Sequence, residues 1–219
     1  MQKIVAVSFK VLLLICALYS VSFFTKTAIK EYTLHEARDV LESFSTNPEA
    51  ASRRQQKALM LTAINKIDSA PNTVVNVAQS YALKARLYHS LSSLEVWPAK
   101  RNQQLKKAIY NNYNAINISH YNLQYWLFDL QIQNEINADQ RELFWSLANV
   151  LTLDKWNYDV LSYASFYCVL QWKNLPATLK EPCSETLKNV WQHEVYKGKL
   201  VFHLSGIYRF EDIVEEMIR

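Results

Sequence analysis

Apolar residues recur every three or four positions along most of the chain, the spacing that places them on one face of a helix. These repeats predict helices at residues 58–67, 74–94, 105–116, 123–136, 141–151, 160–172, 184–197, 199–205 and 210–218, the first with a start near residues 45–48. No convincing alternation of apolar and polar positions, the pattern of a half-buried strand, occurs in the sequence. The pattern therefore predicts an all-α protein, with residues 174–182 as its longest irregular segment.

The amino terminus carries the strongest local signal, because residues 11–24 contain no charged side chain. Extended back to residue 4, with Lys10 reaching the near interface, this run could cross a hydrocarbon core of roughly 30 Å. A cleaved signal peptide has a similar apolar stretch and is the alternative, with Ser20-Val21-Ser22 as its best cleavage site.

The same spacing divides the chain into three predicted segments. Apolar positions continue at helical intervals through residues 29–44, which favours an uncleaved transmembrane anchor (1–26) leading into an amphipathic helical stem (27–47). Residues 48–219 form the predicted all-α domain. Lysines flank both ends of the apolar run, so charge barely decides the orientation. The short amino-terminal tail favours a single-pass protein of the bacterial inner membrane with its large domain in the periplasm.

Composition excludes several classes of protein. Glycine occurs only twice, as Gly198 and Gly206, too few for the tight hairpins of a β-sandwich or the phosphate-binding loops of nucleotide-binding folds. The 24 basic and 20 acidic residues are spread along the chain and give a net charge of +4. Nucleic-acid-binding proteins concentrate basic residues on one stripe, so we expect no nucleic-acid partner.

No catalytic or metal-binding signature occurs in the sequence. None of the five histidines lies four residues from another, the spacing that places two imidazoles on one helix face for zinc. The His-Glu pairs at 35–36 and 193–194 lack the second histidine of the zinc-protease motif. We therefore expect a non-enzymatic protein without cofactor or metal. The weaker alternative is an enzyme whose carboxylates line a sugar-binding pocket without forming a motif.

The three cysteines divide between the apolar run and the predicted domain. Cys16 lies in the run, whereas Cys168 and Cys183 flank residues 174–182 and could form a disulfide in an oxidising compartment. The alternative is that Cys168 is a small buried apolar residue and Cys183 a reduced thiol. A domain that faces the cytoplasm would keep both thiols reduced.

Aromatic residues offer the clearest candidate for a binding surface. The chain has 13 tyrosines, more than one core easily buries, and tyrosine and tryptophan suit both protein interfaces and sugar faces. The candidate interaction surface comprises Tyr121, Tyr125, Trp126, Trp145, Trp156, Tyr158 and Trp172. Packing between helices is the alternative, and it is preferred for Trp156, which follows a predicted helix cap at Asp154.

An approximate repeat connects several of these residues. In residues 105–130 a small residue and apolar positions share one helix, a short polar turn follows, and an aromatic residue lies early in the next helix. Trp126 and Tyr163 occupy equivalent places about 36 residues apart, close to the period of tetratricopeptide repeats, about 34 residues. The sequence predicts an array of antiparallel, tetratricopeptide-like helical hairpins.

Turns and aromatic positions follow one another in a fixed order between residues 100 and 182: Trp126, then Trp145-Ser146-Leu147-Ala148, then Asp154-Lys155-Trp156, and then Trp172-Lys173-Asn174-Leu175-Pro176. In this succession, and in the layout of the anchored amino terminus, the chain resembles the VpsP-like proteins, which are small membrane-anchored, tetratricopeptide-like proteins associated with bacterial exopolysaccharide gene clusters.

The resemblance implies an accessory role without catalytic residues, in which the protein helps to assemble or export a polysaccharide. Its expected partners are the inner membrane and the proteins of a polysaccharide assembly machine, and direct contact with the polysaccharide stays open. A general envelope or secretion adaptor without any carbohydrate role is the alternative.

Overall fold

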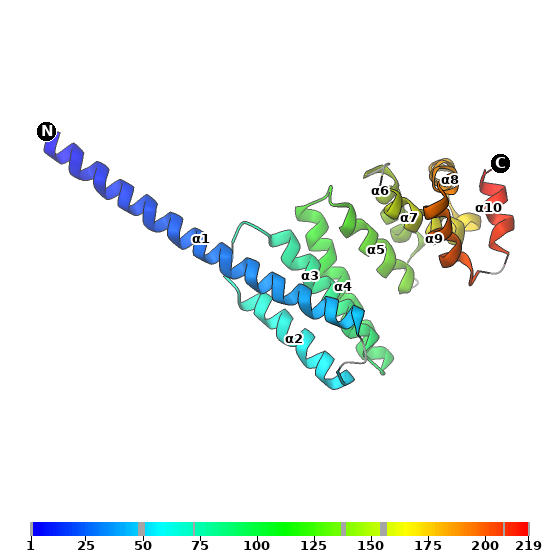
Figure 1. Cartoon of the computed structure of the whole chain (residues 1–219), viewed down its shortest axis with the longest axis horizontal. Helices are drawn as coiled ribbons and strands as arrows, with labels where there is room; N and C mark the ends of the chain where they lie inside the picture. The colour runs from blue at the N-terminus through cyan, green and yellow to red at the C-terminus, as the bar shows by residue number, and fades with distance from the viewer. Residues whose placement is uncertain are drawn as a thin grey trace. The chain divides into compact units, whose positions relative to one another are not determined.

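The computed structural model describes residues 2–47, 51–71, 73–136, 139–153, 157–207 and 209–218, and of residues 2–11 the backbone only. These residues form ten α-helices and one short 3₁₀ helix (Figure 1), which confirms the all-α prediction. The chain divides into two compact units, Met1–Ile118 and Ser119–Arg219. Each unit has a helical core of its own and is described by itself.

Unit 1 is built on its amino-terminal helix. It contains α1 (Gln2–Thr46), α2 (Arg53–Ser69), α3 (Val77–Ser93) and α4 (Pro98–Ile118). The second half of α1 packs against α2 and α3, and α4 packs along α3, while the first half of α1 extends away from the other three helices (Figure 1).

The predicted stem, residues 27–47, is continuous with the apolar run and supplies one wall of the core of unit 1. Leu34 and Ala37 are fully buried, because the apolar stripe of α1 meets those of α2 and α3. The other buried members of this core are Met60, Ala63, Ile64, Ile67, Leu83, Leu87, Leu91 and Leu94.

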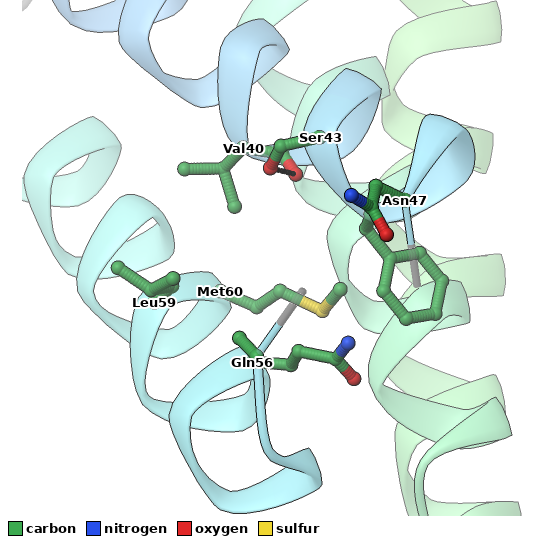
Figure 2. Close-up of a pocket in the computed structure, with 8 residues that line it drawn as sticks. Val40, Ser43, Asn47, Gln56, Leu59 and Met60 are labelled. Atoms are coloured by element: carbon green, nitrogen blue, oxygen red, sulfur yellow. Dashed lines mark hydrogen bonds between the residues drawn. The ribbon is translucent and has the colours of Figure 1, made fainter. Parts of the chain in front are cut away.

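A small pocket lies where the end of α1 faces the start of α2. Figure 2 shows the side chain of Met60 pointing into this space from α2, opposite Val40 and Ser43 of α1. Its other lining residues are Phe44, Asn47, Ala51, Gln56 and Leu59. The volume of about 60 Å³ suits a few water molecules and is too small for a sugar or a peptide.

A buried lysine joins α1 to the end of α2. Lys30 Nζ donates a hydrogen bond of 3.0 Å to the carbonyl oxygen of Ile67. In an uninterrupted helix this carbonyl would accept from the residue four positions later, but that residue is Pro71, which has no N–H. Burial, and then the nearby charge of Lys84, lower the pKa of Lys30 below that of a solvated lysine. Lys30 therefore supplies the donor that Pro71 cannot.

We expect Lys30→Met to lower the free energy of unfolding of unit 1 by roughly 1–3 kcal/mol at neutral pH, because it leaves a buried carbonyl without a donor. Thermal or urea unfolding followed by circular dichroism measures the change. The matched control is Lys66→Met, because Lys66 forms an exposed ion pair of 2.9 Å with Glu36, and such pairs contribute about 0–1 kcal/mol. Equal effects of the two substitutions would contradict the capping role of Lys30.

Unit 2 consists of shorter helices. These are α5 (Leu123–Glu135), α6 (Gln140–Leu153), α7 (Tyr158–Gln171), the 3₁₀ helix (Trp172–Asn174), α8 (Ala177–Trp191), α9 (Glu194–Leu204) and α10 (Phe210–Ile218). Consecutive helices pack like hairpins, α5 with α6 and α7 with α8, while α9 and α10 pack on α7 and α8.

Two predicted breaks near the carboxyl end are wrong. Most of residues 174–182, predicted as irregular, belong to α8, because burial of one apolar helix face outweighs the backbone hydrogen bond that Pro182 removes. This face includes Leu179, Cys183, Leu187 and Val190. The break between the following helices falls at Gln192 and His193. Gly198 lies inside α9, because a single glycine costs a helix only about 1 kcal/mol.

Three helix starts also differ from the prediction. α2 begins at Arg53 and not near residues 45–48, because Ser52 and Gln55 form a reciprocal capping box there. α4 begins at Pro98, since the fixed φ of proline suits a first helical position. The predicted cap Asp154 lies outside the described residues, and the side chain of Asn157 caps α7.

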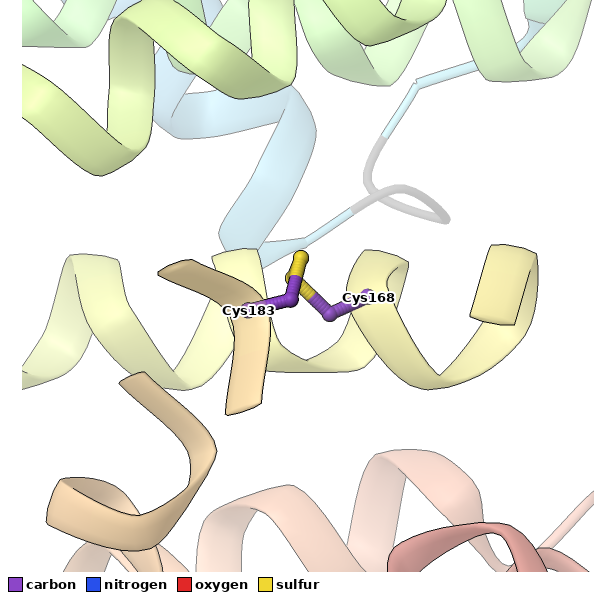
Figure 3. The surroundings of a disulfide bond; sticks show 2 residues. All are labelled: Cys168 and Cys183. Carbon is purple, nitrogen blue, oxygen red and sulfur yellow. A yellow bond between two sulfur atoms is a disulfide. The ribbon is translucent and has the colours of Figure 1, made fainter. Parts of the chain in front are cut away.

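A disulfide fastens α7 to α8. Cys168 and Cys183 are both fully buried and are joined by an S–S bond of 2.06 Å, which bridges the two helices in Figure 3. The two residues are 15 positions apart in the sequence. Closing a loop of this length restricts the unfolded chain and contributes about 3 kcal/mol.

We therefore expect the double substitution Cys168→Ala/Cys183→Ala to lower the free energy of unfolding of unit 2 by about 3 kcal/mol. Urea denaturation of the purified full-length protein in detergent measures this loss. Cys16→Ser is the control, because Cys16 is an exposed free thiol and its replacement leaves the disulfide intact. A double variant as stable as the Cys16→Ser protein would show that the disulfide does not hold the hairpin together.

Candidate functional site

The first half of α1 is an exposed apolar surface. Residues 12–26 are all exposed, and they include Leu12, Leu13, Leu14, Ile15, Leu18, Val21, Phe23 and Phe24. Among the described residues, α1 is the one helix long and apolar enough to cross a membrane, a property that a signal sequence shares. Together with the disulfide, this membrane anchor or signal helix points to an extracytoplasmic location.

Unit 2 carries an open groove that is large enough for a ligand. The groove has a volume of about 900 Å³ and lies between α6 and the start of α8. It is called the Trp145 groove below. Its lining residues are Gln140, Arg141, Glu142, Phe144, Trp145 and Ala148 on one side, and Pro176, Thr178 and Leu179 on the other.

Helical periodicity explains why Trp145 faces the groove. Its neighbours Ser146 and Leu147 are buried against the rest of unit 2, and the hydroxyl of Ser146 donates a hydrogen bond of 2.5 Å to the carboxylate of Asp129 on α5. Successive residues of a helix point in directions about 100° apart. Trp145 is consequently 60% exposed and presents its indole ring to the groove.

Polar groups also line the groove. Arg141 supplies donors and Glu142 supplies acceptors on the α6 side. On the α8 side, Thr178 adds a hydroxyl group that can donate and accept. An aromatic face with donors and acceptors at its edge can bind a sugar ring or a peptide.

The described residues contain no group of three or more histidine, cysteine, aspartate or glutamate side chains that could hold a metal ion.

Two of the predicted surface tryptophans pack inside unit 2. The indole N–H of Trp126 donates to the carbonyl oxygen of His120 at 2.8 Å, and its buried ring meets the imidazole edge-on. The indole N–H of Trp172 donates to Glu216 of α10 at 2.8 Å. Both rings are buried, so they hold helices together and offer little surface to a partner.

Tyr158 also lies among other aromatic rings. It stacks on Tyr196 of α9 with ring centres 5.2 Å apart, and His193 lies against both rings. Next to this cluster, Asp159 accepts a hydrogen bond of 2.5 Å from Lys199 and raises the pKa of that lysine. Tyr158 therefore helps to join the first turns of α7 and α9.

The remaining predicted residues are Tyr121, Tyr125 and Trp156. Tyr121 is exposed and contacts the ring of His120, which brings it near Trp126, and Tyr125 is half-buried. Trp156 lies outside the described residues. Among the members of the predicted set that the structure describes, Trp145 is the one that lines the groove.

Sequence reasoning missed the polar half of the groove. In the sequence, Arg141 and Glu142 indicated only the start of a helix, and Thr178 lay in a segment predicted to be irregular. The sequence contains no signal that joins them, because the two sides of the groove lie far apart along the chain.

A second groove of about 470 Å³ lies near the carboxyl end, lined by Trp191, Glu211, Val214, Glu215 and Ile218. The amine of Lys197 lies 5.1 Å from the ring centre of Trp191, so part of this indole already has a partner. The Trp145 groove is the better candidate, because it is larger and combines donors, acceptors and a half-free indole.

Comparisons of the chain with protein-family models, curated proteins and solved structures find no match. Inferences about function therefore rest on the anchor helix, the helical hairpins and the Trp145 groove themselves.

Proposed function

We propose that this protein is a non-enzymatic, membrane-anchored accessory protein of exopolysaccharide biosynthesis or export. In this proposal α1 crosses a bacterial inner membrane once, and a tetratricopeptide-like array of helical hairpins binds partner proteins on the periplasmic side. The observation that carries the proposal is the continuity of α1, whose exposed apolar half runs without interruption into the core of unit 1.

Continuity favours an anchor over a cleaved signal peptide. Cleavage after Ser22 would remove the apolar run and leave Phe23 and Phe24 exposed at the new terminus. In an intact anchor the exposed rings of Phe23 and Phe24 lie in lipid, an apolar environment that keeps them out of water. The Cys168–Cys183 disulfide supports the periplasmic orientation, because disulfides persist in oxidising compartments.

The Trp145 groove supports a role in recognition. Stacked helical hairpins form extended surfaces that bind other proteins, and an exposed indole is the kind of side chain that dominates binding energy. The same indole can stack on a sugar ring while Arg141 and Glu142 bind hydroxyl groups, so direct contact with the polysaccharide is part of the proposal.

A general envelope or secretion adaptor is the second candidate, because it would use the same anchor and hairpins. The link to polysaccharide rests on the resemblance of residues 100–182 to the VpsP-like proteins. The two candidates differ in one consequence, namely whether loss of the groove changes the amount of polymer.

Topology is the first test of the anchoring. Alkaline phosphatase fused after Arg219 should be active, and a fluorescent protein fused at the same position should not fluoresce. An immunoblot should show that the chain is uncleaved. This result is expected because phosphatase requires the oxidising periplasm that the disulfide indicates. Fluorescence with inactive phosphatase would place the folded units in the cytoplasm, and a shortened chain would identify residues 1–26 as a signal peptide.

Trp145→Ala tests the recognition role. We expect it to change the free energy of unfolding by no more than about 0.5 kcal/mol, as exposed substitutions do, and to reduce both the polymer that cells produce and the recovery of crosslinked partners.

Trp97→Ala is the matched control, because Trp97 is 69% exposed but lies in unit 1 and outside the groove. Loss of partners without loss of polymer would favour the general adaptor. Normal partners and normal polymer would remove the groove from the function.

A further inference from the structure

Unit 1 begins very close to the end of the apolar run. The apolar run ends at Phe24, and Lys30 is the first buried residue that the described part of α1 contains. Six helical residues rise about 9 Å. Lipid headgroups occupy roughly 5–8 Å on each side of the hydrocarbon core. One end of unit 1 must therefore lie at the outer edge of the headgroups if α1 spans the membrane.

The connection between α2 and α3 forms this end of unit 1. Ile67, near the end of α2, accepts from Lys30, and the side-chain amide of Asn76, just before α3, donates to Glu31. Figure 1 shows the connection beside α1 at the point where α1 leaves the other helices. Both ends of the connection are thus fixed at the level of residues 30–31 of α1.

Apolar side chains project from this connection. Val74 is 90% exposed, and its neighbour Val75 is also exposed. On α1, Ile29 and Tyr32 are exposed at the same level. Tyrosine is enriched at membrane interfaces, where its ring lies among apolar chains and its hydroxyl reaches water.

The charges at this end are compatible with a lipid surface. Asp68 is paired with Lys84 at 2.8 Å, and Glu31 accepts from Asn76, so both carboxylates have partners within the protein. Lys26 is exposed, and it follows the apolar run closely enough to meet lipid phosphates.

Helix α1 offers no hinge that would let unit 1 move away from the membrane. Sharp bends in helices occur almost always at proline, at glycine and serine pairs, or at inserted residues. The 45 residues of α1 contain neither proline nor glycine. The anchor therefore holds the α2–α3 connection at a fixed depth.

We propose that the α2–α3 connection is a second membrane contact, in which Val74 and Val75 insert among the lipid headgroups of the bilayer that α1 crosses. Ile29 and Tyr32 lie at the same depth, and Lys26 binds lipid phosphate. This proposal rests on the proposed anchoring by α1. With two contacts, unit 1 is held in one orientation relative to the membrane plane.

The opposite end of unit 1 provides a matched control. Val96 is 69% exposed in the connection between α3 and α4, next to Glu95, which pairs with Lys57 near the start of α2 at 2.9 Å. The 17 residues of α3 separate the two connections, a rise of about 25 Å. Val96 is as apolar as Val74 but lies far outside the headgroups.

The test uses the full-length protein, reconstituted in vesicles of phosphatidylethanolamine and phosphatidylglycerol. The Cys16→Ser substitution removes the free native thiol, so that the remaining native cysteines, Cys168 and Cys183, are both held in the buried disulfide. An environment-sensitive fluorophore is attached to Val74→Cys, to Val96→Cys or, within the anchor, to Leu18→Cys. We expect a blue shift and quenching by a headgroup-level lipid quencher at position 74, and neither at position 96.

Three outcomes separate this proposal from the anchoring. If the probe at position 18 is quenched by a deep lipid quencher while positions 74 and 96 both report water, the second contact is overturned and the anchor stands. If position 18 is not quenched, the anchoring fails and the second contact falls with it. If position 74 is shielded from water without lipid quenching, a protein covers it and the lipid contact is overturned.

Discussion

The structure of unit 1 depends on a single uninterrupted helix. The apolar face of α1 from Leu34 onward closes the core with α2 and α3, while residues 12–26 of the same helix are exposed. Because neither proline nor glycine interrupts α1, the exposed and the buried halves form one rigid element. Any surface of unit 1 consequently lies at a defined distance from the apolar run. A domain that is joined to an apolar helix by a flexible linker has no such fixed distance.

Unit 2 achieves its stability differently. Its helices are short, and covalent or hydrogen-bonded links between them stabilise their packing. The disulfide joins α7 to α8, Trp172 joins the end of α7 to α10, and Ser146 joins α6 to α5. The links from Trp172 and Ser146 are hydrogen bonds to the carboxylates of Glu216 and Asp129. They leave the outer face of α6 free, and this is where Trp145 and its groove lie.

Periodicity predicted the all-α class, the apolar amino terminus and the approximate place of most helices, because each depends on residues close in sequence. It could not separate buried from exposed tryptophans. Trp126, Leu127 and Phe128 are consecutive and point in three directions, so the pattern of α5 does not reveal which one faces the core. The groove was also beyond prediction, since it joins residues 140–148 to residues 176–179 through the packing of α6 on α8.

The hydrogen bond from Lys30 to Ile67 has a consequence for the order of folding. Lys30 precedes α2 in the growing chain, so its ammonium group lacks the Ile67 carbonyl as an acceptor until the end of α2 has been synthesised. The hydrogen bond from Lys30 to the Ile67 carbonyl therefore fixes the alignment of α2 along α1, which is synthesised first. A hairpin paired out of register would leave the buried Lys30 without this acceptor, and this cost disfavours the misaligned hairpin.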